Sequence, residues 1–280
     1  MEGILLLNKT KDKTSRDMVN ELNHIFGMKK IGHTGTLDPI ATGVLVMCMG
    51  KYTKLVDMLS SLKKEYVAMI KLGIKTDTLD ITGTIIESRD IPKISTENIE
   101  IVFNDLLGKQ KQIIPKYSAK KINGKKLYEY ARENKNIVLP ENEIEIYSME
   151  LLDFDAEYIK FKTTVSKGTY IRSLIQKICD NLNIIGTMSD LERTKQGNFS
   201  INDSFTIKDI EKGNYKILNA RDVLDFPVYE LGEEEYNKVK NGNKITIKCD
   251  SKYVILIKNN KEIAIYEKEE TYYRAKIMLI

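Results

Sequence analysis

The chain has 280 residues, 42% of them hydrophobic and 30% charged, and its 44 basic and 40 acidic side chains leave a net charge of +4. At roughly 150 residues per domain this length predicts about two domains, and the composition excludes a disordered or fibrous protein. The longest apolar run, residues 44–49, is far below the roughly 20 residues that cross a bilayer, so we expect no membrane segment and a cytoplasmic location.

The chain begins with a predicted strand followed by a predicted helix. Residues 3–8 are continuously apolar up to the last residue, which indicates a buried strand. Either Thr14 or Ser15 is expected to cap a helix whose apolar residues recur at helical spacing to about residue 26. Gly27 is expected to end that helix.

The middle of the chain mixes strands and helices. Residues 66–74 alternate between apolar and polar side chains as a strand does, and residues 81–86 could pair with them across a turn at 76–78. The remaining predicted elements are a helix at 95–107, strands near 144–152 and 158–165, and a helix at 170–182. Because the order lacks a regular strand–helix–strand rhythm, we expect an α+β fold.

From about residue 228 the pattern changes to short β-like runs. These are residues 244–248, 253–258, 263–267 and 272–279, with turns at 241–243 and 259–260. The end of the chain, 228–280, is therefore predicted to be a small β-rich module.

Charge is unevenly distributed along the chain. Residues 109–132 hold eight basic side chains and one acid, interleaved with tyrosines, whereas residues 140–157 hold seven acids and no base. A basic, tyrosine-rich face is typical of a protein that binds a polyanion such as nucleic acid. The alternative is an ordinary solvated lysine face.

Metal and disulfide chemistry have little support in the sequence. Cys48, Cys179 and Cys249 are an odd, widely spaced set, and His24 and His33 are the two histidines. The segment from Asp77 to Asp80 lacks the third-position ligand of a calcium loop. We expect no metal.

A loop at 32–43 contains three glycines, three threonines, His33 and Asp38. The spacing is not that of a phosphate-binding loop. Its glycines allow the backbone or a ligand to come close, and Asp38 precedes Pro39, which favours an extended conformation. From the residue types alone, a plain turn is the alternative.

Two further segments place chemically useful side chains at the ends of strands. In residues 166–172 a strand breaks at Gly168 into a helix, so Tyr170 and Arg172 lie at the junction. Tyr66 stands at the beginning of a predicted strand. Taken singly, these are also ordinary structural positions.

Taken together, these segments resemble the TruB family of tRNA pseudouridine synthases. The resemblance is carried by GHTGTLDPIATG at 32–43, by YSA at 117–119 with GKKLYEYAR at 124–132, and by SKGTYIR at 166–172. It implies a catalytic domain over residues 1–227, built on a mixed, largely antiparallel sheet of the pseudouridine synthase type. It also implies that 109–132 binds RNA and that 228–280 is a PUA-like module.

The resemblance implies an isomerase that needs no cofactor. The family converts uridine 55, in the T-loop of tRNA, to pseudouridine by breaking the C1′–N1 bond, turning the base and joining C1′ to C5. The expected partner is the T-arm of tRNA, with no membrane and no obligate protein partner.

By match to the family motifs, Asp38 is the expected catalytic carboxylate. It could attack C6 of the base, attack C1′ of the sugar or remove a proton at C2′, and the sequence leaves these three open. Arg172 matches its guanidinium partner, which would keep the carboxylate ionised. Tyr66 matches the residue that stacks on the flipped uracil, and its hydroxyl could assist proton transfer at C5.

The other matched residues would shape the pocket and hold the RNA. His33 resembles the residue that fills the gap left by the flipped base. Tyr170 and Leu191 match pocket walls, although Leu191 could be a plain core residue and Tyr170 could brace the Asp38 loop. The side chains expected to bind phosphates are Lys120, Lys121, Lys125, Lys126 and Arg132. The alternative for these residues is an ordinary solvated face.

Three rival functions remain at this point. One is the catalytic subunit of a guide-RNA pseudouridylation complex, which shares the catalytic motif. Another is a non-catalytic factor that binds or folds tRNA. An enzyme of small-molecule metabolism is disfavoured, because the basic tyrosine-rich segment would then have no purpose.

Overall fold

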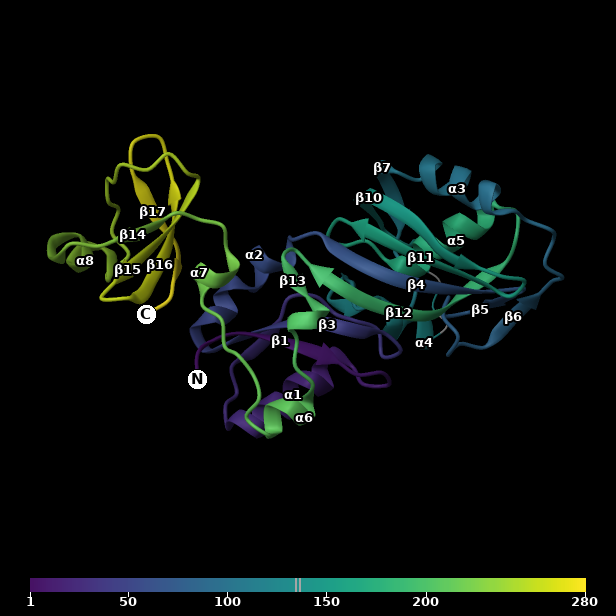
Figure 1. Cartoon of the computed structure of the whole chain (residues 1–280), viewed down its shortest axis with the longest axis horizontal. Coiled ribbons are helices and arrows are strands. Elements are labelled where there is room, and N and C mark those ends of the chain that lie inside the picture. The colour runs from purple at the N-terminus through teal and green to yellow at the C-terminus, as the bar shows by residue number, and fades with distance from the viewer. Residues whose placement is uncertain (134, 136) are drawn as a thin grey trace. The chain divides into compact units, whose positions relative to one another are not determined.

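A computed structural model describes residues 1–133, 135 and 137–280 (Figure 1). The described residues form two compact units. Unit 1 comprises Met1–Pro39, Gly43–Ser60 and Asn198–Ile280, and unit 2 comprises Ile40–Thr42 and Ser61–Gly197. None of the helices in this described part of the chain is long and apolar enough to cross a membrane.

Unit 1 begins with three antiparallel strands and one helix. Strands β1 (Gly3–Lys9) and β2 (Ile31–His33) both pair with β3 (Thr42–Met49). Helix α1 (Ser15–Phe26) packs on them because its buried face meets apolar residues of β1 and β3. The residues of that core include Leu5, Leu7, Met18, Val19, Leu22, Leu45 and Met47.

The ends of α1 confirm the predicted start and stop signals. Thr14 is the N-cap, since its hydroxyl accepts the Asp17 amide at 3.1 Å while the Asp17 carboxylate accepts the Thr14 amide at 2.8 Å. Gly27 follows the helix with φ of 61°, a left-handed conformation that favours glycine.

Short elements complete this part of unit 1. They are η1 (Gly50–Leu55), α2 (Val56–Ser60), β13 (Phe199–Ser200), η2 (Ile201–Asp203), α6 (Ile207–Glu211) and α7 (Ala220–Val223).

The end of the chain forms a β-rich module with its own core, which confirms the predicted change of texture. Strand β14 (Val228–Glu230) pairs in parallel with β15 (Tyr253–Lys258), and β16 (Lys261–Lys268) and β17 (Tyr273–Met278) follow as antiparallel neighbours. The predicted strand at 244–248 is wrong, because only Ile245 there makes an isolated bridge. Helix α8 (Glu233–Val239) was not predicted.

Unit 2 is built on a largely antiparallel sheet, which confirms the α+β class. Its strands lie in the order β12, β4, β11, β10, β7. Their bounds are β4 (Lys64–Leu72), β7 (Gly108–Ile113), β10 (Glu141–Phe154), β11 (Tyr158–Val165) and β12 (Gly186–Gln196). Strands β7 and β12 were not predicted.

Helices α3 (Thr96–Asp105) and α5 (Ile171–Asn181) pack against this sheet (Figure 1). Phe103 of α3 meets Phe161 of β11 with their ring centroids 5.5 Å apart. Two small hairpins, β5 (Ile74–Thr76) with β6 (Ile85–Ser88) and β8 (Lys121–Ile122) with β9 (Lys125–Lys126), and helix α4 (Leu127–Arg132) complete the unit. The expected pairing of 66–74 with 81–86 is therefore wrong, because β4 pairs with β11 and β12, whereas β6 pairs with the short β5.

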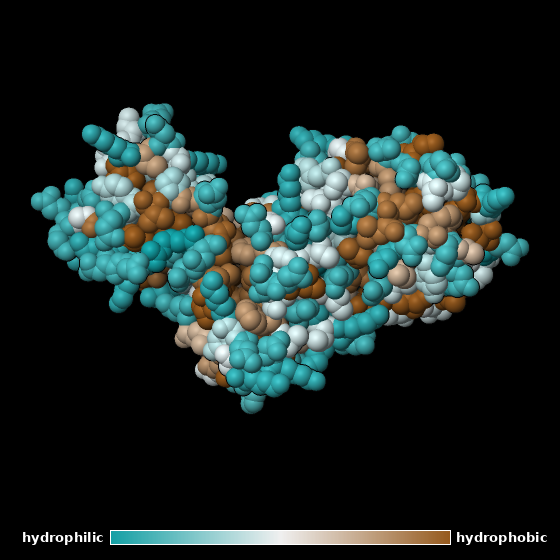
Figure 2. All heavy atoms as spheres, viewed as in Figure 1, coloured by the Kyte–Doolittle hydropathy of each residue, from teal (hydrophilic) through white to brown (hydrophobic). Residues whose placement is uncertain are grey.

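Hydrophobic side chains also reach the surface. Figure 2 shows brown patches among the hydrophilic side chains. In unit 2 the exposed large hydrophobic residues include Ile85, Ile86 and Ile113.

Within unit 1, a buried carboxylate joins the C-terminal module to earlier residues. The Glu262 side chain, only 3% exposed, accepts hydrogen bonds from the Tyr52 hydroxyl at 2.7 Å and from the backbone amides of Ala220 and Arg221 at 3.0 and 2.8 Å. The Arg221 guanidinium lies 3.3 Å from it. Burial and this carboxylate raise the pKa of Tyr52.

We expect Glu262→Leu to lower the free energy of unfolding by about 3 kcal/mol, because it leaves buried donors without an acceptor. Tyr52→Phe removes one of the hydrogen bonds and should cost about 1 kcal/mol. Urea unfolding followed by circular dichroism measures both. If both variants lowered the free energy of unfolding by the same small amount, Glu262 would not be the shared acceptor on which these contacts depend.

Candidate functional site

Asp38 lies in the loop between β2 and β3, and both of its neighbours are held in place. The Leu37 amide donates to the Ser15 hydroxyl at 2.9 Å. On the other side, the Pro39 carbonyl accepts the Lys9 ammonium at 3.1 Å and the Asp12 amide at 2.9 Å. The half-buried Asp38 is therefore presented on a backbone that is fixed on both sides.

Two residues of this support were not recognised as such in the sequence. Lys9 directly follows the predicted first strand and is fully buried. Ser15 was considered as a helix cap, but Thr14 takes that role and leaves the Ser15 hydroxyl to bind the loop. Neither residue carried a local signal, because their partners are about 20 to 30 positions away in sequence.

His33 is the last residue of β2 and is half-buried. Its Nδ1 accepts the Gly35 amide at 3.4 Å, which orients the ring at the start of the same loop. His33 and Asp38 thus come from one short, glycine-containing segment of unit 1.

In unit 2, Tyr66 and Leu191 lie on the same face of the sheet. Tyr66 belongs to the buried face of β4, where it is opposite Arg193 of β12, and Leu191 is opposite the next residue of that face, Ala68. Opposed residues of antiparallel strands project to the same side. The structure therefore brings these two predicted pocket residues together, and both are buried.

Tyr170 and Arg172 lie where predicted, at the start of α5. Tyr170 is the extended residue before the helix. Arg172 is 4% exposed, and its guanidinium donates to the Thr78 carbonyl at 3.0 Å and to the Tyr117 carbonyl at 2.9 Å. The Asp80 carboxylate lies 3.8 Å from it.

Asp80 is a site residue that the sequence analysis missed, since it was weighed there only as a calcium ligand. It is buried, and its carboxylate accepts the Thr82 amide and the Thr78 hydroxyl, each at 3.0 Å. A turn rich in hydroxyls is the one signal that could have pointed to a fixed carboxylate here.

The basic segment is ordered by its tyrosines. Asn123 and Gly124 have φ of 50° and 81° and form a tight turn between β8 and β9. The Lys126 ammonium donates to the Tyr128 hydroxyl at 3.2 Å, and the Arg132 guanidinium lies 5.3 Å from the centre of the Tyr128 ring. The hairpin and α4, which is labelled in Figure 1, belong to unit 2.

Its basic side chains differ in exposure. Lys125 forms an ion pair with Glu133 and lies 5.1 Å from the centre of the Tyr130 ring. Lys125 and Lys126 are half-buried, whereas Lys120, Lys121 and Arg132 are exposed.

The predicted site residues are divided between the two units. His33 and Asp38 belong to unit 1, and the other predicted residues, including Arg172, belong to unit 2. The pairing of Asp38 with Arg172 stays a prediction.

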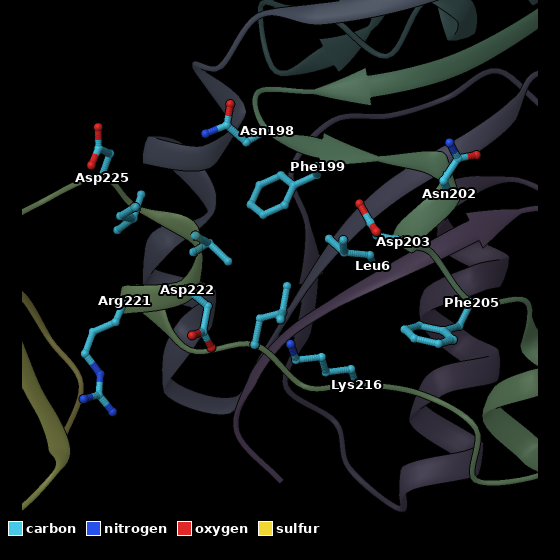
Figure 3. Close-up of a pocket in the computed structure, with 13 residues that line it drawn as sticks. Leu6, Asn198, Phe199, Asn202, Asp203, Phe205, Lys216, Arg221, Asp222 and Asp225 are labelled. Atoms are coloured by element: carbon cyan, nitrogen blue, oxygen red, sulfur yellow. The ribbon is translucent and has the colours of Figure 1, made fainter.

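Two cavities differ in whether they lie next to these residues. A cavity of about 910 Å³ in unit 2 is lined by Thr78 and Tyr117, whose carbonyls accept Arg172, and by Gln112. Another, of about 640 Å³ in unit 1, is lined by Phe199, Asp203 and Asp222 among others (Figure 3) and contains no predicted site residue. The unit 2 cavity is therefore the one next to candidate chemistry.

Two of the three cysteines, Cys48 and Cys179, are buried. Burial raises the pKa of both Cys48 and Cys179 to about 12, so neither is a ready nucleophile. Among these residues no three His, Cys, Asp or Glu side chains are grouped so that they could hold a metal ion.

Lys64 is a buried cation near Tyr66. It lies two residues before Tyr66 on the same face of β4. Its ammonium donates to the Leu62 carbonyl at 2.9 Å. Burial, followed by the positive charges of Arg193 and Lys167, lowers the pKa of Lys64 to about 8.

Comparisons with known proteins identify relatives over most of the chain. Residues 23–171 match the model of the "TruB family pseudouridylate synthase (N terminal domain)". The tRNA pseudouridine synthase B of Caldanaerobacter subterraneus subsp. tengcongensis is 42% identical over 246 residues, covering 88% of this chain and 86% of that protein. The enzyme of the same name from Clostridium tetani is 40% identical over 273 residues, covering 96% of this chain and 93% of that protein.

Among solved structures, a Cbf5-Nop10-Gar1 complex contains a chain with the same fold. It superposes with a TM-score of 0.75 at 21% identity, covering 99% of this chain and 85% of that chain. At this identity the likeness concerns the fold alone.

The lowered pKa of Lys64 predicts a pH dependence of stability. Between pH 8 and the ordinary lysine value of 10.5 the unfolded chain binds more protons than the native one, so stability rises with pH. Relative to Lys64→Met, the wild type should gain on the order of 1–3 kcal/mol across this window. Urea unfolding at several pH values measures this, and parallel curves for the two proteins would contradict it.

Proposed function

Since the chain belongs to the TruB family of pseudouridine synthases, we propose that this isomerase, which converts uridine in tRNA to pseudouridine, acts on uridine 55 of the T-loop. We propose further that Asp38 is its catalytic carboxylate. The observation that carries this second proposal is the support of the Asp38 loop by Ser15, Lys9 and the Asp12 amide.

The reaction balances without a redox partner or net hydrolysis. The C1′–N1 bond breaks, the base turns within the pocket, C1′ bonds to C5, and the hydrogen of C5 leaves as a proton while N1 gains one. An ionised Asp38 can assist by attack at C6 or C1′, or by removing the C2′ proton. Each of these roles needs a carboxylate held in one position, which the pinned loop provides.

Arg172 is proposed to keep that carboxylate ionised and oriented. Its guanidinium is buried and already fixed by the Thr78 and Tyr117 carbonyls and by Asp80. A cation held in this way needs no rearrangement when substrate binds, and this makes its charge effective.

The flipped uracil is proposed to lie against Tyr66 and Leu191, which share one face of the sheet. Tyr170 would form a further wall from the start of α5. His33 is proposed to fill the space that the base vacates in the T-loop, a role that suits a flat ring with polar edges.

The basic hairpin and α4 are proposed to hold phosphates of the T-arm through Lys120, Lys121, Lys125, Lys126 and Arg132. The exposure of the first two and the tyrosine contacts of the others support this. We further assign residues 1–227 to the catalytic domain and 228–280, with its own sheet and core, to a PUA-like module.

We expect Asp38→Asn to reduce pseudouridine formation at least about 100-fold, because the amide can neither attack nor remove a proton. The measurement is tritium release from a T-arm hairpin labelled at C5 of uridine, with no guide RNA or other protein added. The matched control is Asp57→Asn, an exposed aspartate of α2, which should retain full activity.

Two outcomes of this assay would overturn parts of the proposal. Release by Asp38→Asn at the wild-type rate would remove Asp38 from catalysis. Binding of the hairpin without release by the wild type would favour a non-catalytic factor or one that requires a guide RNA.

Phosphate contacts predict a salt-dependent affinity. Lys120→Ala and Lys121→Ala should each reduce the slope of log affinity against log salt by about one, because each lost contact releases one counterion fewer. Filter binding of the hairpin at several salt concentrations measures the slope. Lys212→Ala, at the exposed lysine that directly follows α6, serves as the control, and an unchanged slope in the first two would assign them to a solvated face.

A further inference from the structure

The start of α5 is attached to the strand that opens the basic segment. Along β7 and the residues after it, the Ile113 carbonyl accepts the Ser173 hydroxyl at 2.9 Å, and the Tyr117 carbonyl accepts the Arg172 guanidinium. Directly before Ile113, Gln112 contacts Tyr170, which precedes the helix. The first residues of α5 are thus held from one side by a single stretch of chain.

Gln112 makes the most specific of these contacts. It is 8% exposed, and its amide oxygen accepts the Tyr170 N–H at 2.8 Å while its amide nitrogen donates to the Tyr170 carbonyl at 3.0 Å. Asparagine and glutamine carry a donor and an acceptor in one planar group, so one side chain grips both polar backbone atoms of Tyr170.

The residue paired with Gln112 extends this grip to the preceding turn. Asn142 of β10 is opposite Gln112 in the sheet, and its amide donates to the Gly168 carbonyl at 3.2 Å. Gly168 has φ of 80°, so the chain turns there into α5. Two adjacent amide side chains therefore hold both ends of the segment from Gly168 to Tyr170.

The hydrogen bonds from Gln112 hold the start of α5, where the N-cap side chain makes no capping hydrogen bond. Tyr170 is the N-cap residue of α5 and provides no capping hydrogen bond from its side chain. Its conformation, with φ of −99° and ψ of 114°, is extended. Gln112 thus holds the backbone at this junction through two hydrogen bonds, and Arg172 follows two residues later.

We propose that Gln112 is a positioning residue for the isomerisation, which fixes Tyr170 and Arg172 by clamping the backbone of Tyr170. The inference rests on the proposed roles of Tyr170 and Arg172 in that reaction. In this proposal Gln112 acts through Tyr170 and Arg172 and does not itself touch the reacting atoms.

The test is single-turnover tritium release from full-length tRNA labelled at C5 of uridine, with enzyme in excess, alongside tRNA binding. Gln112→Met keeps the side-chain length and removes the donor and the acceptor. We expect the rate constant to fall about 10- to 100-fold, as for a small misplacement of catalytic groups. The dissociation constant for tRNA should stay within about threefold, because the binding contacts are retained.

The control is Asn98→Leu in α3 of the same unit. The side-chain oxygen of Asn98 accepts the Ser95 amide and the Ser95 hydroxyl, each at 3.2 Å, so this variant loses hydrogen bonds of similar kind but none to Tyr170. Its rate constant should stay near that of the wild type. A rate constant for Gln112→Met equal to that of Asn98→Leu would overturn the proposal.

Gln112→Glu provides a second, independent readout, which can be used even if Gln112→Met does not fold. A protonated carboxyl has an O–H donor and a carbonyl acceptor in the shape of an amide, whereas the carboxylate has no donor. The ratio of its rate constant to that of the wild type should therefore rise as the pH falls, and a flat ratio would overturn the clamp. A wild type that releases no tritium would instead overturn the proposed function, and this inference with it.

Discussion

In unit 2 the buried guanidinium of Arg172 needs hydrogen-bond acceptors, and the surrounding loops are arranged to provide them. Arg172 is almost inaccessible to water, so each N–H that it carries must meet an oxygen of the protein. These oxygens come from the turn that contains Thr78 and Asp80 and from Tyr117, which lies beyond β7. Two loops far apart in sequence are thereby fixed to the first turn of α5, and the cavity beside them takes its shape from that arrangement.

Unit 1 also contains a buried cation that is surrounded by hydrogen-bond acceptors. The ammonium of Lys9 is buried at the end of β1 and donates to the carbonyls of Thr10 and Pro39. A buried lysine is costly unless it is paired or hydrogen-bonded, so its presence gives a reason for the loop of Asp38 to adopt one conformation. In both units, therefore, a cation organises backbone segments in addition to any role toward a substrate.

Local patterns predicted local structure well, and long-range structure poorly. Helix α1 and the alternation of β4 followed from periodicity and caps, and the residues of the motifs were found at strand ends and helix starts as expected. Strand β7 was missed because its sequence, GKQKQI, has a buried glutamine where an apolar residue would mark a strand. Asp80 and Lys9 were missed as site residues because their importance comes from partners distant in sequence, which no single segment reveals.

The way in which the Asp38 loop is held also has a practical use. The hydrogen bonds that pin it end on backbone atoms of Leu37 and Pro39, and none of these uses the carboxylate between them. These backbone hydrogen bonds do not depend on which side chain stands at position 38. A chain altered only at Asp38 should keep them, together with the basic residues proposed to bind RNA, and could serve as bait that retains unreacted RNAs from a cell extract for sequencing.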